Sequence, residues 1–195
     1  MQKRKKRTDE TKKLIVSAFI ELLNIKDAAH INVIDIAKRA HVDRGTFYRY
    51  FENKQALIED CEENFLDKLY FVHKDLLSEA KKSGDYSDMS IFIEQILAII
   101  EENIQMVNAL LNKTGNISFQ EKMRKFLIEQ NIVTFKQLTN QKSSEKQTDL
   151  LVSYSSSAIL GVIKFWSNNY KTYEKADIVT FINDITLHGV IDFIK

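Results

Sequence analysis

Apolar residues recur at intervals of three and four along almost the whole chain, which is the spacing of an amphipathic α-helix. The first apolar stripe runs from Leu14 to Leu23, and Thr8 stands before it as the expected N-cap. No stretch shows the strict alternation of a half-buried strand. The chain has no proline and only 5 glycines, so long helices can continue uninterrupted. The pattern therefore predicts an all-α fold.

Two short helices joined by a tight turn follow the first one. Asn32 is placed to cap a helix over residues 33–40, with an acidic residue, Asp35, three positions later. Asp43 is placed to cap a second short helix that ends at Glu52-Asn53. Two helix caps this close together indicate a helix-turn-helix unit.

A long amphipathic stripe begins near Lys54 and continues to Ala80. Beyond a polar loop, the spacing predicts further helices at 87–103, 104–113, 117–139, 145–169 and 174–194. The chain should thus hold about nine helices. At 195 residues with 44% apolar and 28% charged side chains, it is long enough to bury a core as a soluble globular protein.

Charge is distributed unevenly along the chain. The 28 basic and 27 acidic side chains leave a net charge of only +1. Residues 1–54, however, hold 13 basic against 7 acidic side chains, and residues 55–195 hold 15 against 20. A basic N-terminal part on an acidic body suggests that the N-terminal part binds a polyanion.

Several classes of protein are excluded by the sequence. No apolar stretch approaches the 18 or more residues of a membrane span, and the richest, 158–166, is broken by Lys164. A single cysteine, Cys61, and the lack of a secretory signal favour a cytoplasmic location. The 4 histidines lack metal-ligand spacing, and no nucleophile motif or glycine-rich phosphate loop occurs. We therefore expect no enzyme, no metal and no cofactor.

The second short helix carries the residue types that a DNA recognition helix needs. Phe47 and Phe51 lie four apart and should form its inner, core-facing stripe. Arg44 in the first turn could donate two hydrogen bonds to a guanine edge, and Thr46 could meet a thymine methyl group or a phosphate. Gly45, which lacks a side chain, would let the helix approach the DNA closely.

Other polar residues of this region suit phosphate oxygens, which fix register rather than sequence. Tyr48, Tyr50 and Lys54 are of this kind, although the tyrosines equally suit a half-buried position and Lys54 a solvated helix start. The basic run at residues 3–7 could lie along phosphates or enter a minor groove, or could be a disordered solubilising tail.

The segment resembles the TetR/AcrR family of bacterial transcriptional regulators on the residues IDIAKRA at 34–40 and VDRGTFYRYFENKQAL at 42–57. The resemblance implies a helix-turn-helix DNA-binding domain at 1–54 and a helical regulatory and dimerisation domain at 55–195. It implies a sequence-specific regulator, expected to be a repressor, that binds a palindromic operator in double-stranded DNA as a homodimer and is released by a small-molecule effector. With Gly45, the expected DNA-binding residues are Asn32, Val33, Arg44, Thr46, Tyr48, Arg49, Tyr50 and Lys54.

Two residues depart from the family's pattern. His41 stands where glycine is usual, at a turn position that tends to need a positive φ. Asp43 replaces the usual serine cap; it caps equally well, but its charge should weaken non-specific affinity for DNA.

A stripe of small residues is the most informative part of the body. Ser153, Ser157 and Gly161 lie four apart and would let another helix approach closely. The resemblance implies that 150–168 and 177–194 form a four-helix dimer interface, to which we also assign Lys164 and Phe165. The alternative is tight packing within one subunit.

A ligand pocket in the body is implied by the resemblance alone. The aromatic and apolar residues expected to line it, each of which also suits a plain core, are Phe65, Leu69, Phe92, Phe119, Phe126 and Trp166. The alternative function is that of a helical co-regulator that acts mainly through protein–protein contacts. Binding to DNA should weaken steeply with salt, whereas flat salt dependence would favour the co-regulator.

Overall fold

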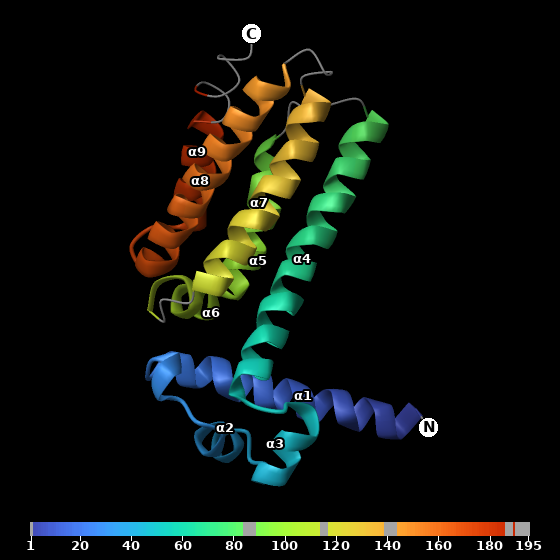
Figure 1. Cartoon of the computed structure of the whole chain (residues 1–195), viewed down its shortest axis with the longest axis vertical. Helices are drawn as coiled ribbons and strands as arrows, with labels where there is room; N and C mark the ends of the chain where they lie inside the picture. Colours follow the sequence, from blue (N-terminus) through green and yellow to red (C-terminus); the bar gives the residue numbers. More distant parts are fainter. Residues whose placement is uncertain (1, 84–88, 114–116, 139–143, 186–188, 190–195) are drawn as a thin grey trace.

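The computed structural model describes residues 2–83, 89–113, 117–138, 144–185 and 189, and the elements within these ranges are helices without a strand. Helix α1 lies across one end of the molecule, α2 and α3 lie beyond it, and α4 rises from α3 to join a bundle of the later helices (Figure 1). The all-α prediction is confirmed. The elements are α1 (Gln2–Leu23), η1 (Ala28–His30), α2 (Val33–Arg39), α3 (Arg44–Tyr50), α4 (Lys54–Ser83), α5 (Met89–Glu102), α6 (Ile104–Asn108), η2 (Ala109–Lys113), α7 (Ile117–Leu138), α8 (Glu145–Asn169) and α9 (Lys175–Asp184).

The start of α1 differs from the prediction. The helix begins at Gln2, so Thr8 lies inside it and the prediction of Thr8 as the N-cap is wrong. The reason is that residues 2–7 are glutamine, lysine and arginine, all good helix formers that offer no reason to stop.

The later helices follow the predicted boundaries with two exceptions. The helix predicted at 104–113 is split, because α6 ends at Asn108 and η2 continues as a π-helix. The helix predicted at 174–194 is α9, which begins at Lys175. Residues 87–88, 139, 186–188 and 190–194 of the predicted helices lie outside the described residues.

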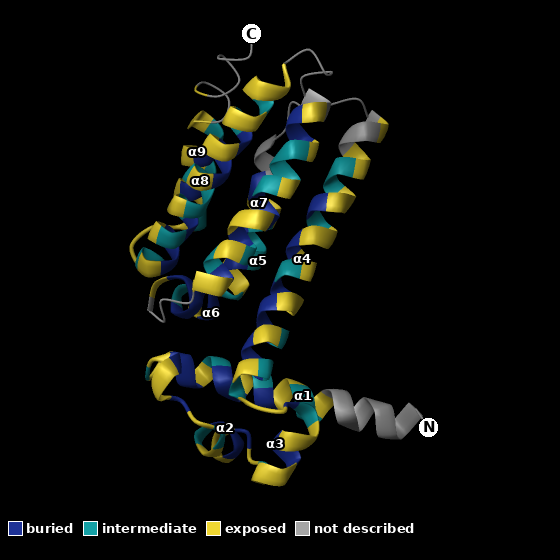
Figure 2. Cartoon of the chain, in the orientation of Figure 1, coloured by how far each residue is buried: buried dark blue, intermediate teal, exposed yellow. Residues whose placement is uncertain are grey.

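One apolar core runs from the N-terminal helices into the body. It joins Phe19 of α1 and Phe47 of α3 to Phe65 of α4 and Trp166 of α8, all at most 2% exposed (Figure 2). The predicted inward orientation of Phe47 and Phe51 is confirmed, because these side chains are 0% and 4% exposed.

Polar contacts also connect the N-terminal helices to the body. Lys12 of α1 pairs with Asp60 of α4 at 2.5 Å. Asn24, just after α1, donates to the Gln105 side chain of α6 at 2.7 Å. These contacts lie at the edges of the apolar core and restrict how α1 can turn relative to α4 and α6.

Helix α8 is long and apolar enough to cross a membrane by length and composition alone. Here it packs along α7, where Asn131 donates to the hydroxyls of Ser155 and Ser156 at 3.2 and 2.9 Å. One side of the helix is buried in the body, with Val152, Ile163 and Trp166 at most 3% exposed, whereas Phe165 on another side is 50% exposed.

Candidate nucleic-acid interface

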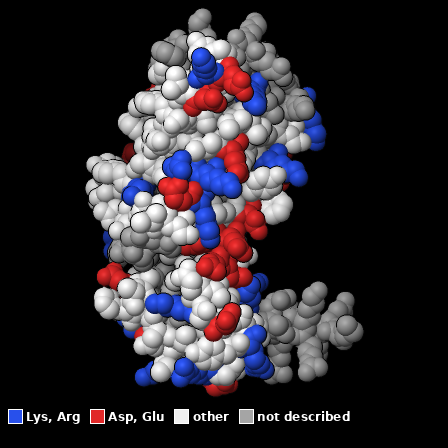
Figure 3. All heavy atoms as spheres, in the orientation of Figure 1, with Lys and Arg blue, Asp and Glu red and all other residues white. Residues whose placement is uncertain are grey.

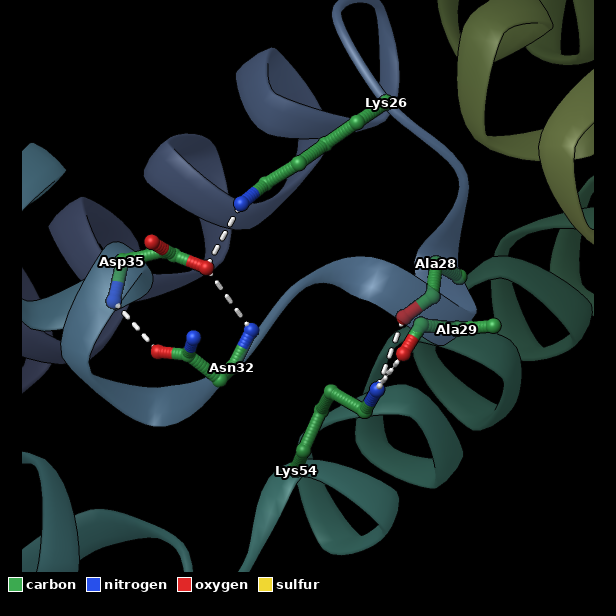
Figure 4. A network of polar contacts seen from close by, with 6 residues as sticks. All are labelled: Lys26, Ala28, Ala29, Asn32, Asp35 and Lys54. Carbon is green, nitrogen blue, oxygen red and sulfur yellow. Dashed lines mark hydrogen bonds and ion pairs between the residues drawn. The ribbon is translucent and has the colours of Figure 1, made fainter.

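The first turn of α2 is fixed by a reciprocal cap. The Asn32 side chain accepts from the backbone N–H of Asp35 at 3.0 Å, and the Asp35 carboxylate accepts from the N–H of Asn32 at 3.0 Å. Lys26 pairs with the same carboxylate at 2.6 Å (Figure 4). The hydrogen bond from Lys26 is the main reason why the pKa of Asp35 lies below its usual value. The predicted cap is confirmed, and it leaves Asn32 exposed and Val33 half-buried on the core.

The turn between α2 and α3 contains His41 in the left-handed region, with φ of 55°. This confirms the expectation that the position needs a positive φ. Histidine tolerates this conformation better than β-branched residues do. The turn is closed by the Val42 N–H, which donates to the Ala37 carbonyl at 3.0 Å.

The N-terminus of α3 is capped as predicted by Asp43. Its carboxylate accepts from the Thr46 N–H and from the Thr46 hydroxyl, both at 2.7 Å. These bonds to Thr46 are the main reason why the pKa of Asp43 lies below its usual value. The carboxylate is thus used within the helix, and its charge remains at an exposed helix start.

The outer face of α3 presents a basic and aromatic surface. Arg44, Gly45, Tyr48 and Arg49 are exposed, and Tyr48 remains 43% accessible. The Arg44 guanidinium lies 5.3 Å from the centre of the Tyr48 ring and donates to the Tyr48 hydroxyl at 3.0 Å. Stacking and the hydrogen bond together hold a planar donor in place before any ligand arrives.

Two of the predicted DNA-binding residues are turned toward the protein. Thr46 is 8% exposed, and its hydroxyl accepts from Arg49 at 2.8 Å while donating to Asp43. Tyr50 is half-buried and packs against the core. The polar surface that this helix exposes to solvent therefore centres on Arg44, Tyr48 and Arg49.

Lys54, at the first position of α4, contacts the backbone of the α1–α2 connection. Its Nζ donates to the Ala28 carbonyl at 2.7 Å and lies 3.5 Å from the Ala29 carbonyl (Figure 4). Burial lowers the pKa of Lys54 from its ordinary value. This contact was not predicted from the sequence, because η1 was not predicted.

Charge is unevenly distributed on the face of the molecule drawn in Figure 3. Basic side chains gather at the end where α2 and α3 lie, and acidic side chains form a band just above them (Figure 3). This agrees with the excess of basic residues in 1–54. A polyanion would therefore be attracted to the end that presents α3.

A second surface of interest lies on α8 and α9. Gly161 and Phe165 of α8 line an apolar groove of about 520 Å³ with Phe181 of α9. Phe165 and Phe181 are about half exposed, at 50% and 51%. Ser153 and Ser157 are also exposed on α8. Lys164 differs from the rest of the predicted dimer residues, because its Nζ lies 3.4 Å from the Gln120 side chain of α7.

The body contains a small apolar cavity of about 70 Å³ between α4, α5, α7, α8 and α9. Of the six residues predicted to line a ligand pocket, Phe126 lines this cavity. The side chain of Phe92 lies outside the described residues. The other four are at most 2% exposed in the core: Phe65, Leu69, Phe119 and Trp166.

One lining residue of the cavity, His73 of α4, was missed by the sequence analysis. It is 3% exposed, and its Nε2 lies 3.4 Å from the Thr134 hydroxyl of α7. The signal was present, because His73 continues the buried stripe of Phe65 and Leu69 at four-residue spacing. Burial lowers the pKa of His73 to about 4, so the ring is neutral near pH 7.

Comparison with known proteins places both halves of the chain. Residues 15–61 match the family model described as bacterial regulatory proteins of the tetR family. Residues 87–188 match the model of a transcriptional regulator C-terminal region. The first match contains the helix-turn-helix described above, and the second contains the described parts of α5 to α9.

Individual relatives are regulators as well. The chain is 27% identical over 136 residues to the HTH-type transcriptional regulator SAR0097 of Staphylococcus aureus, a match that spans 65% of this chain and 71% of the relative. It is 30% identical over 98 residues to the dhaKLM operon activator DhaS of Lactococcus lactis, covering 49% of this chain and 52% of that one.

Solved structures show the same fold. The structure of the dihydroxyacetone kinase operon activator DhaS superimposes with a TM-score of 0.67 at 21% identity, covering 91% of this chain and 94% of that one. NalD, a repressor of a multidrug efflux pump in Pseudomonas aeruginosa, gives a TM-score of 0.67 at 19% identity, covering 93% and 97%.

Proposed function

Because this chain belongs to the TetR family of bacterial transcriptional regulators and carries its DNA-binding helix-turn-helix, we propose that it binds a palindromic operator as a homodimer and represses the genes beside it. The family and the relatives are regulators rather than enzymes. The operator, the dimer and the sign of regulation are the parts that we propose.

The observation that carries the operator proposal is the outer face of α3. Arg44 is stacked on Tyr48 and hydrogen-bonded to it, so its donors are already oriented at the exposed start of the helix. A planar guanidinium in this position suits the O6 and N7 acceptors of guanine in a major groove. Arg49 and Tyr48 would meet phosphates, as would the exposed Asn32 at the start of α2.

The remaining predicted contacts need closer approach. Val33 would reach a phosphate through its backbone N–H, and Gly45 leaves room for the backbone. Thr46 and Tyr50 are turned inward, and we assign them to DNA only through the groups that remain accessible beside Arg49.

The dimer proposal is supported by the exposed apolar face of α8 and α9. A Cβ added at Gly161 would meet nothing within 4 Å, so the glycine is not needed for packing within the subunit. Together with Ser153, Ser157 and Phe165, it forms a smooth surface on which the same helices of a second copy could pack. A symmetric dimer would present two α3 helices to successive major grooves of a two-fold operator.

Similar proteins include both a repressor and an activator. NalD is a repressor and DhaS is an activator, and both share the fold. We propose repression, and activation is the second candidate because the dhaKLM operon activator DhaS matches at 30% identity. A reporter gene placed behind the operator that this protein binds separates repression from activation. Deletion of the regulator raises expression of the reporter under repression and lowers it under activation.

We also propose that the chain divides into a DNA-binding domain at 1–54 and a regulatory domain at 55–195, that it is cytoplasmic, and that a small effector bound in the body releases it from DNA. The cavity beside His73 and Phe126 supports the effector, and its volume of about 70 Å³ favours a very small apolar ligand or a cavity that widens on binding.

The test is selection of bound duplexes from random oligonucleotides with the purified full chain, followed by titration of the selected duplex over a salt series. We expect an inverted repeat and a linear fall of log K with log salt. Absence of duplex binding at low salt would refute the proposal and favour a co-regulator that acts through protein contacts.

A further inference from the structure

Lys54 makes a polar link between α4 and the α1–α2 connection. Lys54 is the first residue of α4, and its Nζ reaches back to the carbonyls of Ala28 at 2.7 Å and Ala29 at 3.5 Å. Both carbonyls belong to η1, the single 3-10 turn of residues 28–30. Ala28 is only 4% exposed, and its carbonyl accepts from Lys54 and, at 3.2 Å, from the backbone N–H of Ile31.

The same connection is held from its other side by a second lysine. Lys26 pairs with Asp35 at 2.6 Å, and Asp35 closes the cap with Asn32 (Figure 4). The segment between Lys26 and Asn32 thus lies between two lysine contacts, one made from α4 and one made to α2. Asn32, the N-cap of α2, comes two residues after η1, the turn that Lys54 contacts.

We propose that Lys54 is a positioning residue of the DNA-binding domain, whose ammonium group fixes η1 and so the start of α2, rather than a phosphate contact. The inference rests on the proposed function and changes the role that the family resemblance implies for this lysine. Residues that would face the operator, such as Asn32, are then placed by Lys54 without contact between Lys54 and DNA.

The geometry favours this role for a simple reason. To reach a phosphate, the ammonium group would give up a 2.7 Å hydrogen bond to a carbonyl that has little access to water. A hydrogen bond from a charged donor to a poorly hydrated acceptor contributes more to stability than an exposed ion pair with a phosphate returns. Lys54 therefore stays on η1 when DNA binds.

A consequence for regulation follows from the position of Lys54 in the chain. Helix α4 runs from Lys54 through His73, which lines the cavity of the body. Any movement of the N-terminal end of α4 would pull on η1 through Lys54. The contact is thus a direct mechanical link between the helix that lines the cavity and the start of α2.

The first arm of the test needs no DNA. Amide hydrogen exchange is followed at His30 and Ile31, whose N–H groups donate to Asp27 and Ala28 within η1. Lys54→Met removes the donor at similar side-chain length, and we expect exchange at both amides to accelerate about tenfold. Lys54→Gln and Lys54→Arg keep a donor and should restore part of the protection. Lys38→Met, at an exposed lysine of α2, is the matched control and should leave both amides unchanged.

The second arm is a salt series with a random-sequence duplex and the full-length chain. A phosphate contact by Lys54 would lower the log–log slope by about 0.9 for each subunit, or about 1.8 for a dimer. We expect the slope of Lys54→Met to equal that of the unmodified protein, with weaker binding at every salt concentration.

Two results would overturn the proposal. One is exchange at His30 and Ile31 that Lys54→Met accelerates no more than Lys38→Met does. The other is a slope reduced by about 1.8, whatever the exchange shows. If even the unmodified protein binds no duplex, the proposed function fails, and the exchange arm still decides the role of Lys54.

Discussion

Burial of His73 should make the stability of the body depend on pH below neutrality. The Thr134 hydroxyl donates to the Gln130 carbonyl at 3.0 Å, so its oxygen is left to accept from the Nε2–H of a neutral His73 ring. Burial lowers the pKa of His73 to about 4, against about 6.5 in the unfolded chain. Between these values the unfolded chain binds a proton that the folded one does not. Stability therefore falls as the pH falls from about 6.5 toward 4.

The size of the effect follows from the two pKa values. At pH 7 the histidine contributes a loss of only about 0.2 kcal/mol, and at pH 5 about 2 kcal/mol. We predict that the free energy of unfolding drops by about 2 kcal/mol more in the unmodified protein than in His73→Gln between these pH values. The glutamine keeps a donor toward Thr134 and does not titrate.

The assay is urea unfolding at fixed protein concentration, followed through the fluorescence of the single tryptophan, Trp166. Trp166 is 1% exposed in the body and reports its packing directly. All other titratable groups are the same in the two proteins, so their contributions cancel in the difference. Equal pH dependence of the two proteins would refute the reasoning.

Three further predictions concern the surfaces and the core. Arg44→Ala should remove about 1–3 kcal/mol of discrimination at one base pair of each half-site, measured against operators changed at single positions; unchanged discrimination would contradict guanine readout. Gly161→Arg should convert a dimer to monomers in analytical ultracentrifugation, and the monomers should stay folded because the new side chain has open space within the subunit. Gly161→Ala should leave the dimer intact. A dimer that survives Gly161→Arg would place the interface elsewhere. Lys122→Met removes the ammonium group that pairs at 2.8 Å with Glu62, a side chain that is 1% exposed, and should lower the free energy of unfolding in urea by about 2–3 kcal/mol. The double variant with Glu62→Gln should recover part of this loss. A double variant as unstable as Lys122→Met alone would argue against the ion pair as the cause.

Local features were the ones that the sequence predicted well. The caps at Asn32 and Asp43, the positive φ at His41 and the inward face of Phe47 depend on residues within a few positions of each other. Such interactions form inside one helix or turn, so the order of residues is enough to predict them. The predicted start of α1 is wrong because the helix propensity of the basic residues before Thr8 outweighs the capping preference of that threonine.

In the candidate DNA-binding site, too, the contacts between residues close in sequence were easier to predict than the others. Arg44 and Tyr48 lie four apart on one helix, so their neighbourhood follows from helical spacing. Thr46 also forms its bonds with nearby residues, but the sequence alone does not show that its hydroxyl binds Asp43 and Arg49. The resemblance implies that Lys54 meets DNA, because a family pattern reflects which residue types occur at a position. That the Lys54 ammonium group lies on the Ala28 carbonyl in this chain depends on the fold.

The main helices, the caps at Asn32 and Asp43 and the basic character of the N-terminal part follow from the order of residues, because these properties come from short-range spacing and from composition. The contact of Lys54 with Ala28, the place of His73 at a cavity and the open face at Gly161 depend instead on how the helices pack. The partners in each of these cases are far apart in the sequence or lie on different helices. Their proximity results from the packing of whole helices, in which burial and hydrogen bonding are satisfied together.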